Sequence, residues 1–461
     1  MNSSTARRGM LVFSLVAFGQ IVSVTGSGLT SFALGAWVYQ RTQSATQFAL
    51  ILLFALLPSL AIAPLTGALV DRWDRRWVMI LSDTGSGLCT LAMALLFSAG
   101  RLQVWHIYVA MALSSAFHGF QVSAYMASVS LLVPKEQLGR ANGITQLGET
   151  SRYLFSPILA GWLMGVVGVS GVMLIDFATF LLAVLTCCWV QFPRPETTPT
   201  GRAARGSLLR EAAFGWQYIT IRPGLLGMLI MYAVSNYATN MTDTLMPPML
   251  LNLGSPQVMG SVLSAGGIGM LAGSLLMSAW GGPKRRMVGV LLFSALIGLF
   301  VVLIGGLQSV PLIAAATFGY FFPFPLVNGC DSAIWQSKVP PDVQGRVFAI
   351  RRMLAFSVIP LAYITAGPLA DRVFEPLMAD KGALAASLGS VIGVGAGRGM
   401  GLLIVVMGLA VVLVIATAAL NPRVRKVEDE LPDVVRVQVP NYAGSSASGD
   451  KTTVIETEFD F

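Results

Sequence analysis

The sequence has little charge. Asp, Glu, Lys and Arg make up 11% of its 461 residues, whereas 55% are hydrophobic and the mean hydropathy is +0.71. Soluble proteins carry about 25% charged residues, so a soluble globular fold is disfavoured. The net charge of +8 does not indicate a nucleic-acid-binding surface, because Lys and Arg lie at the ends of apolar segments and form no patch interleaved with aromatic residues.

Residues typical of catalytic and metal sites are also scarce. The two histidines, His106 and His118, are too few for a His-rich metal site, and no convincing catalytic triad is present. A Gly-x-x-x-x-Gly-Lys-Ser/Thr loop for nucleotide phosphates is missing. We therefore expect no enzyme, no cofactor and no metal. The cysteines all lie inside apolar runs, where small buried side chains are expected rather than disulfides or metal ligands: Cys89, Cys187, Cys188 and Cys330.

What the chain has instead is a series of apolar runs near 20 residues long. Each can cross a hydrocarbon core of about 30 Å as a helix, and a helix satisfies its own backbone where lipid offers no partner. We predict an all-α polytopic membrane protein. Its twelve transmembrane helices are expected at residues 10–38, 46–70, 77–99, 104–133, 141–167, 170–192, 223–252, 257–281, 287–306, 309–337, 344–370 and 399–420.

Basic residues are unevenly distributed between alternate connections. With the N-terminus inside, most Lys and Arg fall on the inner side, where transmembrane proteins are enriched in them. We therefore predict a multi-pass protein of the cytoplasmic cell membrane with both termini in the cytoplasm. Arg7 and Arg8 precede a run too long for a signal peptide, so it is expected to be the first membrane helix. The outer segments hold only Arg41, Arg101, Arg372, Lys381 and Arg398.

A polar, basic stretch divides the runs into two groups of six. The predicted organisation is an N-terminal six-helix bundle at 1–192, a cytoplasmic linker at 193–222, a C-terminal six-helix bundle at 223–420 and a flexible cytoplasmic tail at 421–461. The halves repeat each other at an offset of 206 residues, which relates Ala160-Gly161 to Ala366-Gly367 and residues 133–140 to 339–346. Two pseudo-symmetric bundles are therefore expected.

A charged hinge, Gly67-Ala68-Leu69-Val70-Asp71-Arg72-Trp73-Asp74-Arg75-Arg76, separates the second and third runs. It resembles the signature loop of the major facilitator superfamily of transporters, Gly-x-x-x-Asp-Arg/Lys-x-Gly-Arg-Arg/Lys, and matches it at Gly67, Asp71, Arg72, Arg75 and Arg76. The resemblance implies a cytoplasmic gate. Asp71 would accept hydrogen bonds from a helix N-terminus of the opposite half, and the arginines would pair with carboxylates across the interface. The alternative is a hinge that only anchors the topology.

Three further stretches resemble the branch of this superfamily that contains macrolide-efflux proteins and the enterobactin exporter: residues 71–76, 139–143 and 366–376. This resemblance implies export of a hydrophobic or amphipathic small molecule (an antibiotic, siderophore or secondary metabolite) by proton antiport. The segment 156–161 resembles the Gly-Pro-x-x-Gly-Gly motif of drug antiporters. Pro157 and Gly161 within it are expected either to serve antiport or simply to pack helices closely.

Polar side chains inside the apolar runs are candidates for the pathway of substrate and protons, because such groups are costly in lipid. Glu149 and Arg152 can pair on one helix face, either as a coupling site or as a static pair. His118 has a packing role as its alternative, and Asp83 and Asp176 are expected to be structural. The candidate pathway set is His118, Gln121, Glu149, Arg152, Asn236, Asn240, Asp243, Asn328 and Asp331.

The functional prediction is a monomeric secondary transporter in the lipid bilayer that exports a small molecule in exchange for protons. One alternative is an importer or flippase-like carrier of a lysolipid or another metabolite. A second alternative, of a different class, is a membrane scaffold or sensor that transports nothing.

Overall fold

The structure, a computed structural model, describes residues 3–70, 73–133, 137–190, 216–339 and 344–430. Within these ranges the chain is helical and contains no strand. The helices of the first half are α1 Ser3–Thr42, α2 Ala45–Val70, α3 Arg75–Ser98, α4 Val104–Leu132 and α5 Leu138–Trp189. Those of the second half are α8 Pro223–Leu253, α9 Pro256–Trp280, α10 Arg286–Gly306, α11 Val310–Phe321, α12 Phe324–Lys338, α13 Gln344–Leu369, η2 Ala370–Phe374, α14 Glu375–Met378, α15 Ala385–Ile392, α16 Arg398–Leu420, α17 Pro422–Arg425 and α18 Val427–Glu430.

These helices supply the twelve predicted spans. Nine described segments are long and apolar enough to cross a membrane on their own. α4 and α8 are as long but less apolar, because His118 and Gln121 interrupt one and Asn236 and Asn240 the other. The twelfth span comes from α5, which holds two.

Two predicted spans are reshaped by single residues. α5 continues through the predicted break, but Gly168 has φ 68° and ψ −178°, a conformation that only glycine adopts readily, so the helix changes direction there. The predicted tenth span is divided into α11 and α12 at Pro323, whose missing N–H cannot continue the helical hydrogen bonds.

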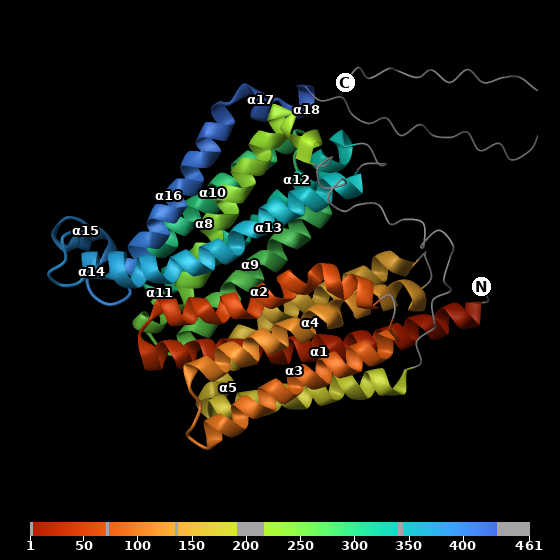
Figure 1. Cartoon of the computed structure of the whole chain (residues 1–461). Helices are drawn as coiled ribbons and strands as arrows, with labels where there is room; N and C mark the ends of the chain where they lie inside the picture. The colour runs from red at the N-terminus through yellow and green to blue at the C-terminus, as the bar shows by residue number, and fades with distance from the viewer. Residues whose placement is uncertain (1–2, 71–72, 134–136, 191–215, 340–343, 431–461) are drawn as a thin grey trace, which may run out of the picture.

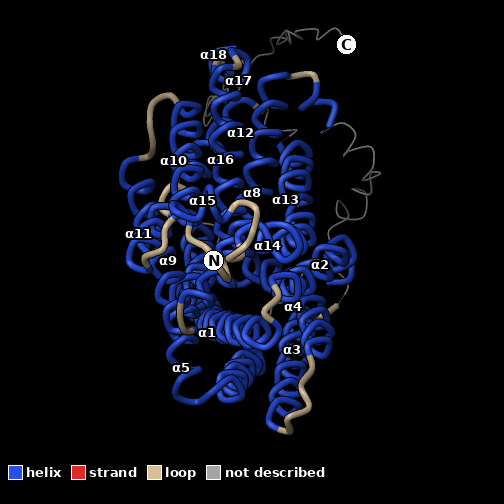
Figure 2. The backbone as a smooth tube through the Cα atoms, turned by 90° about the vertical axis from the view of Figure 1, so that its left-hand side faces the viewer, coloured by secondary structure: helices blue, strands red, loops and turns tan. Residues whose placement is uncertain are grey.

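The helices gather into two bundles, α1 to α5 and α8 to α16 (Figures 1 and 2). Their internal packing is equivalent. α1 packs along α5 as α8 packs along α13 and α16, α2 packs on α4 as α9 packs on α11 and α12, and α3 and α10 occupy matching positions. Tyr125 and Thr145 are hydrogen-bonded at 3.3 Å, and Asp331 and Arg351, both 206 positions later, form an ion pair. The sequence repeat therefore corresponds to a structural one.

The bundles contact each other mainly through α5 with α9 and α2 with α13. At one end a single hydrophobic core joins them, in which Tyr39 and Phe48 pack with Met241, Leu245 and Ala362. Toward the other end each bundle has a core of its own. Figure 1 shows the helices spreading apart in that direction, from the α14 side toward the N-terminus. We call these the closed end and the open end.

The chain after α16 folds back onto the second bundle. α17 packs on α8, and Val424 and Val427 are buried there. Glu428 accepts hydrogen bonds from the backbone N–H groups of Arg286 and Met287, at 3.0 and 2.8 Å, and so caps the N-terminus of α10. The expectation of a flexible tail from residue 421 is therefore wrong for residues 422–430. The rest of the tail, and the predicted linker up to residue 215, lie outside the described residues.

Candidate substrate pathway

A chamber of about 1010 Å³, partly open to the surroundings, lies between the two bundles. Asn240 and Asp243 of α8 face it, and Asp243 accepts a hydrogen bond from the Tyr320 hydroxyl at 3.0 Å. The remaining lining comes from α2, α5, α8, α9, α11 and α13 and is mostly apolar, with Leu52, Met246, Leu263, Met270 and Phe321. The chamber thus combines flexible thioether and aromatic walls with a few polar groups.

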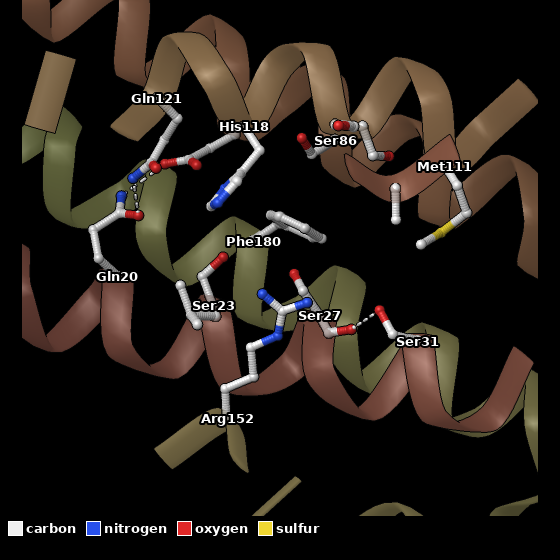
Figure 3. A pocket seen from close by; sticks show the side chains of 15 residues that line it. Gln20, Ser23, Ser27, Ser31, Ser86, Met111, His118, Gln121, Arg152 and Phe180 are labelled. Carbon is white, nitrogen blue, oxygen red and sulfur yellow. Dashed lines mark hydrogen bonds between the residues drawn. The ribbon is translucent and has the colours of Figure 1, made fainter. Parts of the chain in front are cut away.

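A second cavity, of about 730 Å³, lies inside the first bundle (Figure 3). We call it the N-half cavity. Most of its lining residues are polar: alongside an imidazole, a guanidinium and a carboxyl group it contains Gln20, Ser23, Ser27, Ser31, Ser86, Ser114, Ser115 and Gln121. His118 and Arg152 project into it from α4 and α5, on opposite sides in Figure 3.

Arg152 lines both the N-half cavity and the chamber. It lies five residues before Pro157 in α5. Its side chain packs against α1 at Gly28, where an added Cβ would be 3.2 Å from Arg152 Cγ. The predicted pairing of Arg152 with Glu149 stays a prediction, because the Glu149 side chain is outside the described part of the structure. Arg152 is thus the group through which charge in one cavity can influence the other.

A hydrogen-bonded chain crosses the N-half cavity from α4 to α3. Gln121 Nε2 donates to Gln20 Oε1, and Gln20 Nε2 donates to Asp83 Oδ2 at 2.8 Å. Asp83 is 4% exposed and lines the cavity. Our expectation gave Asp83 a structural role only; the signal that could have singled it out is the polar stripe Asp83, Ser86 and Thr90 at i, i+3 and i+7 of α3.

Asp176 of α5 is buried elsewhere in the same bundle. Its carboxylate accepts a hydrogen bond from Thr90 at 3.5 Å, and a Cβ on Gly26 of α1 would be 2.8 Å from Oδ1. Asp176 therefore packs where α1, α3 and α5 meet, without contributing to the lining of the N-half cavity or of the chamber.

The polar residues of the second bundle are divided between two places. Asn236 and Asn328 line a smaller cavity of about 400 Å³ within the bundle, whereas Asn240 and Asp243 face the chamber. Asn328 accepts a hydrogen bond from Tyr232 at 2.6 Å. The three predicted pathway residues of α8, Asn236, Asn240 and Asp243, therefore serve two cavities, because a helix that faces the interface also faces its own bundle.

Asp331 is held by a partner that the sequence analysis missed. The Arg351 guanidinium forms an ion pair with it, and Trp335 Nε1 donates to Asp331 Oδ1 at 3.1 Å. Arg351 also lies 5.1 Å from the centre of the Trp335 ring. The Asp331 side chain is 3% exposed, so it is a paired carboxylate inside the bundle.

Of the predicted gate, Asp71 and Arg72 lie outside the described residues, while Gly67 is in the last turn of α2 and Arg75 begins α3. Arg76 donates to the backbone carbonyls of Cys187, at 3.1 Å, and Cys188. A cation at the end of α5 is favourable for the helix dipole. In this conformation Arg76 therefore binds its own half rather than the opposite one.

Glycines allow the halves to meet at the closed end. A Cβ on Gly161 would be 2.8 Å from the Pro256 carbonyl of α9, and one on Gly260 would be 2.4 Å from the Pro157 carbonyl of α5. Gly367, 206 positions after Gly161, lies as close to Thr46 of α2. The 156–161 segment thus contacts the opposite bundle directly at Pro157 and Gly161.

Asp371 connects the halves at this closed end. Its carboxylate accepts hydrogen bonds from Ser44 Oγ at 2.7 Å and from the N–H groups of Ala45 and Thr46 at 2.9 Å, which caps the N-terminus of α2. Residues 367–372 read Gly-Pro-Leu-Ala-Asp-Arg and residues 67–72 read Gly-Ala-Leu-Val-Asp-Arg. The same pattern therefore ends α13 at the closed end and α2 at the open end.

Two equivalent six-helix bundles around a shared chamber, which in the described residues share a hydrophobic core at one end, are the architecture of a membrane transporter. The chain belongs to the Major Facilitator Superfamily, whose family model matches residues 16–363. Transport of small molecules across a lipid bilayer, not catalysis, is the role of such a protein.

Similar proteins include efflux pumps. Macrolide efflux protein A of Streptococcus pyogenes is 25% identical over 369 residues, which cover 79% of this chain and 90% of that protein. The multidrug efflux pump Tap of Mycolicibacterium fortuitum is 25% identical over 380 residues, 80% of this chain and 91% of the pump. An inward-facing, unoccupied bacterial homologue of the human lysosomal transporter Spinster superposes with a TM-score of 0.66 at 12% identity, over 89% of this chain and 97% of that one. The last likeness shows the fold.

Replacing Gly260 by Leu should reduce transport at least tenfold. The side chain would collide with the Pro157 carbonyl at the α5–α9 contact, so the closed end could not form, and overpacking a tight contact is costly. Substrate flux per molecule of inserted protein measures the effect. Gly306→Leu is the matched control, because nothing lies within 4 Å of its Cβ position at the end of α10. Equal flux from the two variants would contradict the prediction.

Proposed function

We propose that this transporter exports hydrophobic or amphipathic small molecules from the cytoplasm in exchange for protons, by alternating access in the cell membrane. The observation that carries the proposal is the chamber between the bundles. It is shared by both halves, is lined by Met and Phe side chains, and contains the Asp243 carboxyl group and the Arg152 guanidinium. Such a lining suits a greasy solute with a polar or charged handle, and the similarity to macrolide and multidrug efflux pumps supports the same class.

The charge distribution supports an orientation. Among the described residues, ten basic side chains lie at the open end and five at the closed end: Arg75, Arg76, Arg222, Lys284, Arg285, Arg286, Lys338, Arg423, Arg425 and Lys426 against Arg41, Arg101, Arg372, Lys381 and Arg398. Since basic loops stay in the cytoplasm, the open end is proposed to be cytoplasmic and the conformation inward-open. Both termini would then be cytoplasmic.

The cytoplasmic gate predicted at residues 67–76 would be the counterpart, at the open end, of the Asp371 contact at the closed end. α2 and α13 pack against each other across the interface. Asp371, at the end of α13, caps the start of α2 in the present conformation. Asp71, which follows α2 in the sequence, would cap the start of α13 when the cytoplasmic end closes. The two contacts would then alternate, each stabilising one conformation.

Transport into inverted membrane vesicles tests the function. Acidifying the vesicle lumen should drive accumulation of the dye Hoechst 33342 or of radiolabelled erythromycin, and dissipating the gradient with nigericin should abolish it. Vesicles without the protein are the control. Accumulation that ignores the proton gradient would contradict antiport.

The same assay separates the alternatives. Net movement only in the opposite direction would favour an importer or a flippase-like carrier. If the protein is a scaffold, we expect no flux, and neutralising Glu149, Asp243 and Asp331 together should leave the flux unchanged.

A further inference from the structure

We propose that the N-half cavity is the binding site of the coupling proton and that the Asp83 carboxylate is the group that accepts it. The inference rests on the proposed antiport and deepens it. It goes beyond the sequence analysis, which named Glu149, and not Asp83, as a candidate coupling group of the first bundle.

The contacts of the described buried carboxylates separate those that bind a cation or a helix N-terminus from those that do not. Asp331 is paired with Arg351, and Asp371, Glu375 and Glu428 each cap a helix N-terminus through backbone N–H groups. Each of these four carboxylates is therefore already bound by a cation or by the backbone donors of a helix end.

Asp83 differs from these groups in two ways. Its hydrogen-bond donor is a neutral amide, that of Gln20, and its carboxyl group lines a cavity large enough for water. Asp176 has hydroxyl donors but does not contribute to the lining of that cavity. A coupling group must both bind a proton and exchange it, and Asp83 meets both conditions within the first bundle. Asp243, whose donor is the neutral Tyr320 hydroxyl, also faces open space, but it lies in the chamber itself, where it would contact the solute.

The surroundings of Asp83 are mostly uncharged. α1 contributes Gln20, α4 contributes Gln121 and His118, and α5 contributes the Cys187 thiol, which lies 4.0 Å from Gln20 Nε2. Arg152 is the cation that lines the cavity. With Asp83 ionised, the carboxylate and the guanidinium balance each other; with Asp83 protonated, the pair carries one net positive charge.

Arg152 carries this change to the solute, because it also lines the chamber. In a low-dielectric interior, an unbalanced charge acts over distances that water would screen. A protonated Asp83 therefore disfavours a cationic solute beside Asp243, and a cationic solute disfavours the proton. One proton enters Asp83 from the outer side as the solute leaves, and it is released from the carboxyl group to the cytoplasm before the next solute binds. The substrate class that fits is an amphipathic cation.

Solute binding by the purified protein tests the site. The affinity for Hoechst 33342 should fall at least tenfold on acidification from pH 8 to pH 5.5 in the wild-type protein. In Asp83→Asn the affinity should change less than twofold between the same two pH values. The matched control, Asp176→Asn, removes a buried carboxylate of the same bundle and should keep the wild-type pH dependence. An Asp83→Asn protein with the wild-type pH dependence would overturn the proposal.

A second measurement uses the unmodified protein, in case Asp83→Asn does not fold. Dicyclohexylcarbodiimide reacts with protonated carboxyl groups in apolar surroundings, and peptide mass spectrometry locates the adduct. We expect labelling of Asp83 at low pH and protection by Hoechst 33342. Labelling of other carboxyl groups with none at Asp83 would refute the assignment. Wild-type vesicles that fail to respond to a proton gradient would instead defeat the antiport proposal itself.

Discussion

Asp331→Asn is expected to destabilise the protein by about 3–5 kcal/mol, the usual cost of removing one partner of a buried ion pair. The Arg351 guanidinium, whose side chain is 20% exposed, would then be left without its carboxylate inside the second bundle. Asn retains an acceptor for Trp335 Nε1. The lost stability is therefore due to the missing carboxylate charge and not to a missing hydrogen bond with Trp335. The apparent melting temperature in detergent, measured by scanning fluorimetry, should drop clearly.

The double variant Asp331→Asn/Arg351→Met is the matched control. It removes both charges and should recover most of the stability, since the equivalent position of the first bundle already holds an uncharged pair, Tyr125 and Thr145. A double variant less stable than Asp331→Asn would show that Arg351 stabilises the bundle through its contact with the Trp335 ring instead.

Asp371→Ala is expected to open the closed end. The substitution removes three hydrogen bonds to a carboxylate that join the bundles, and hydrogen bonds to charged groups contribute about 1.5–3 kcal/mol each. A loss of about 2.8 kcal/mol is already a hundredfold change in an equilibrium constant. The population that is open at this end should therefore rise at least tenfold. Distances between spin labels at Gln43 and Lys381, which are exposed at this end in opposite halves, report it.

A graded series sharpens this test, in a background without the exposed Cys188. Asp371→Asn keeps one acceptor oxygen and should lie between the wild-type protein and Asp371→Ala, whereas Asp380→Ala changes an exposed carboxylate nearby and should leave the distances unchanged. Asp71→Asn should shift the population in the opposite direction and lower transport without affecting membrane insertion. Unchanged distances in Asp371→Ala would show that the shared hydrophobic core alone holds the end closed.

The number and placement of the spans could be predicted from the sequence, and so could the repeat. α16 begins and ends within one residue of its predicted bounds, and Gly168 lies between two predicted spans that the chain makes as one interrupted helix. Local composition is sufficient here, because lipid demands about 20 apolar residues of each span whatever its neighbours are. The helices α15, α17 and α18 were not predicted, since segments of four to eight residues form through contacts with the bundle rather than through their own pattern.

The candidate site was predicted in part. His118, Gln121 and Arg152 line the N-half cavity, and Asn240 and Asp243 face the chamber. Asp83 was expected to be structural, and its place in the lining of the N-half cavity was not predicted; Arg351 was not considered. Both omissions have one origin: a polar residue in an apolar run shows that something must satisfy it, but the run does not contain the partner.

By itself, the sequence determined that the chain crosses a membrane about twelve times, in two related halves, with its basic residues toward one side. Only the tertiary structure decided which carboxylates are held by cations or helix ends and which face open space. Gln20 binds Asp83, which is 63 residues away in the sequence, and Gln121, which is 101 residues away. Asp371 binds Ser44, which is 327 residues away. Such long-range contacts depend on how whole helices pack, whereas the hydrophobicity of a segment determines only whether that segment crosses the membrane.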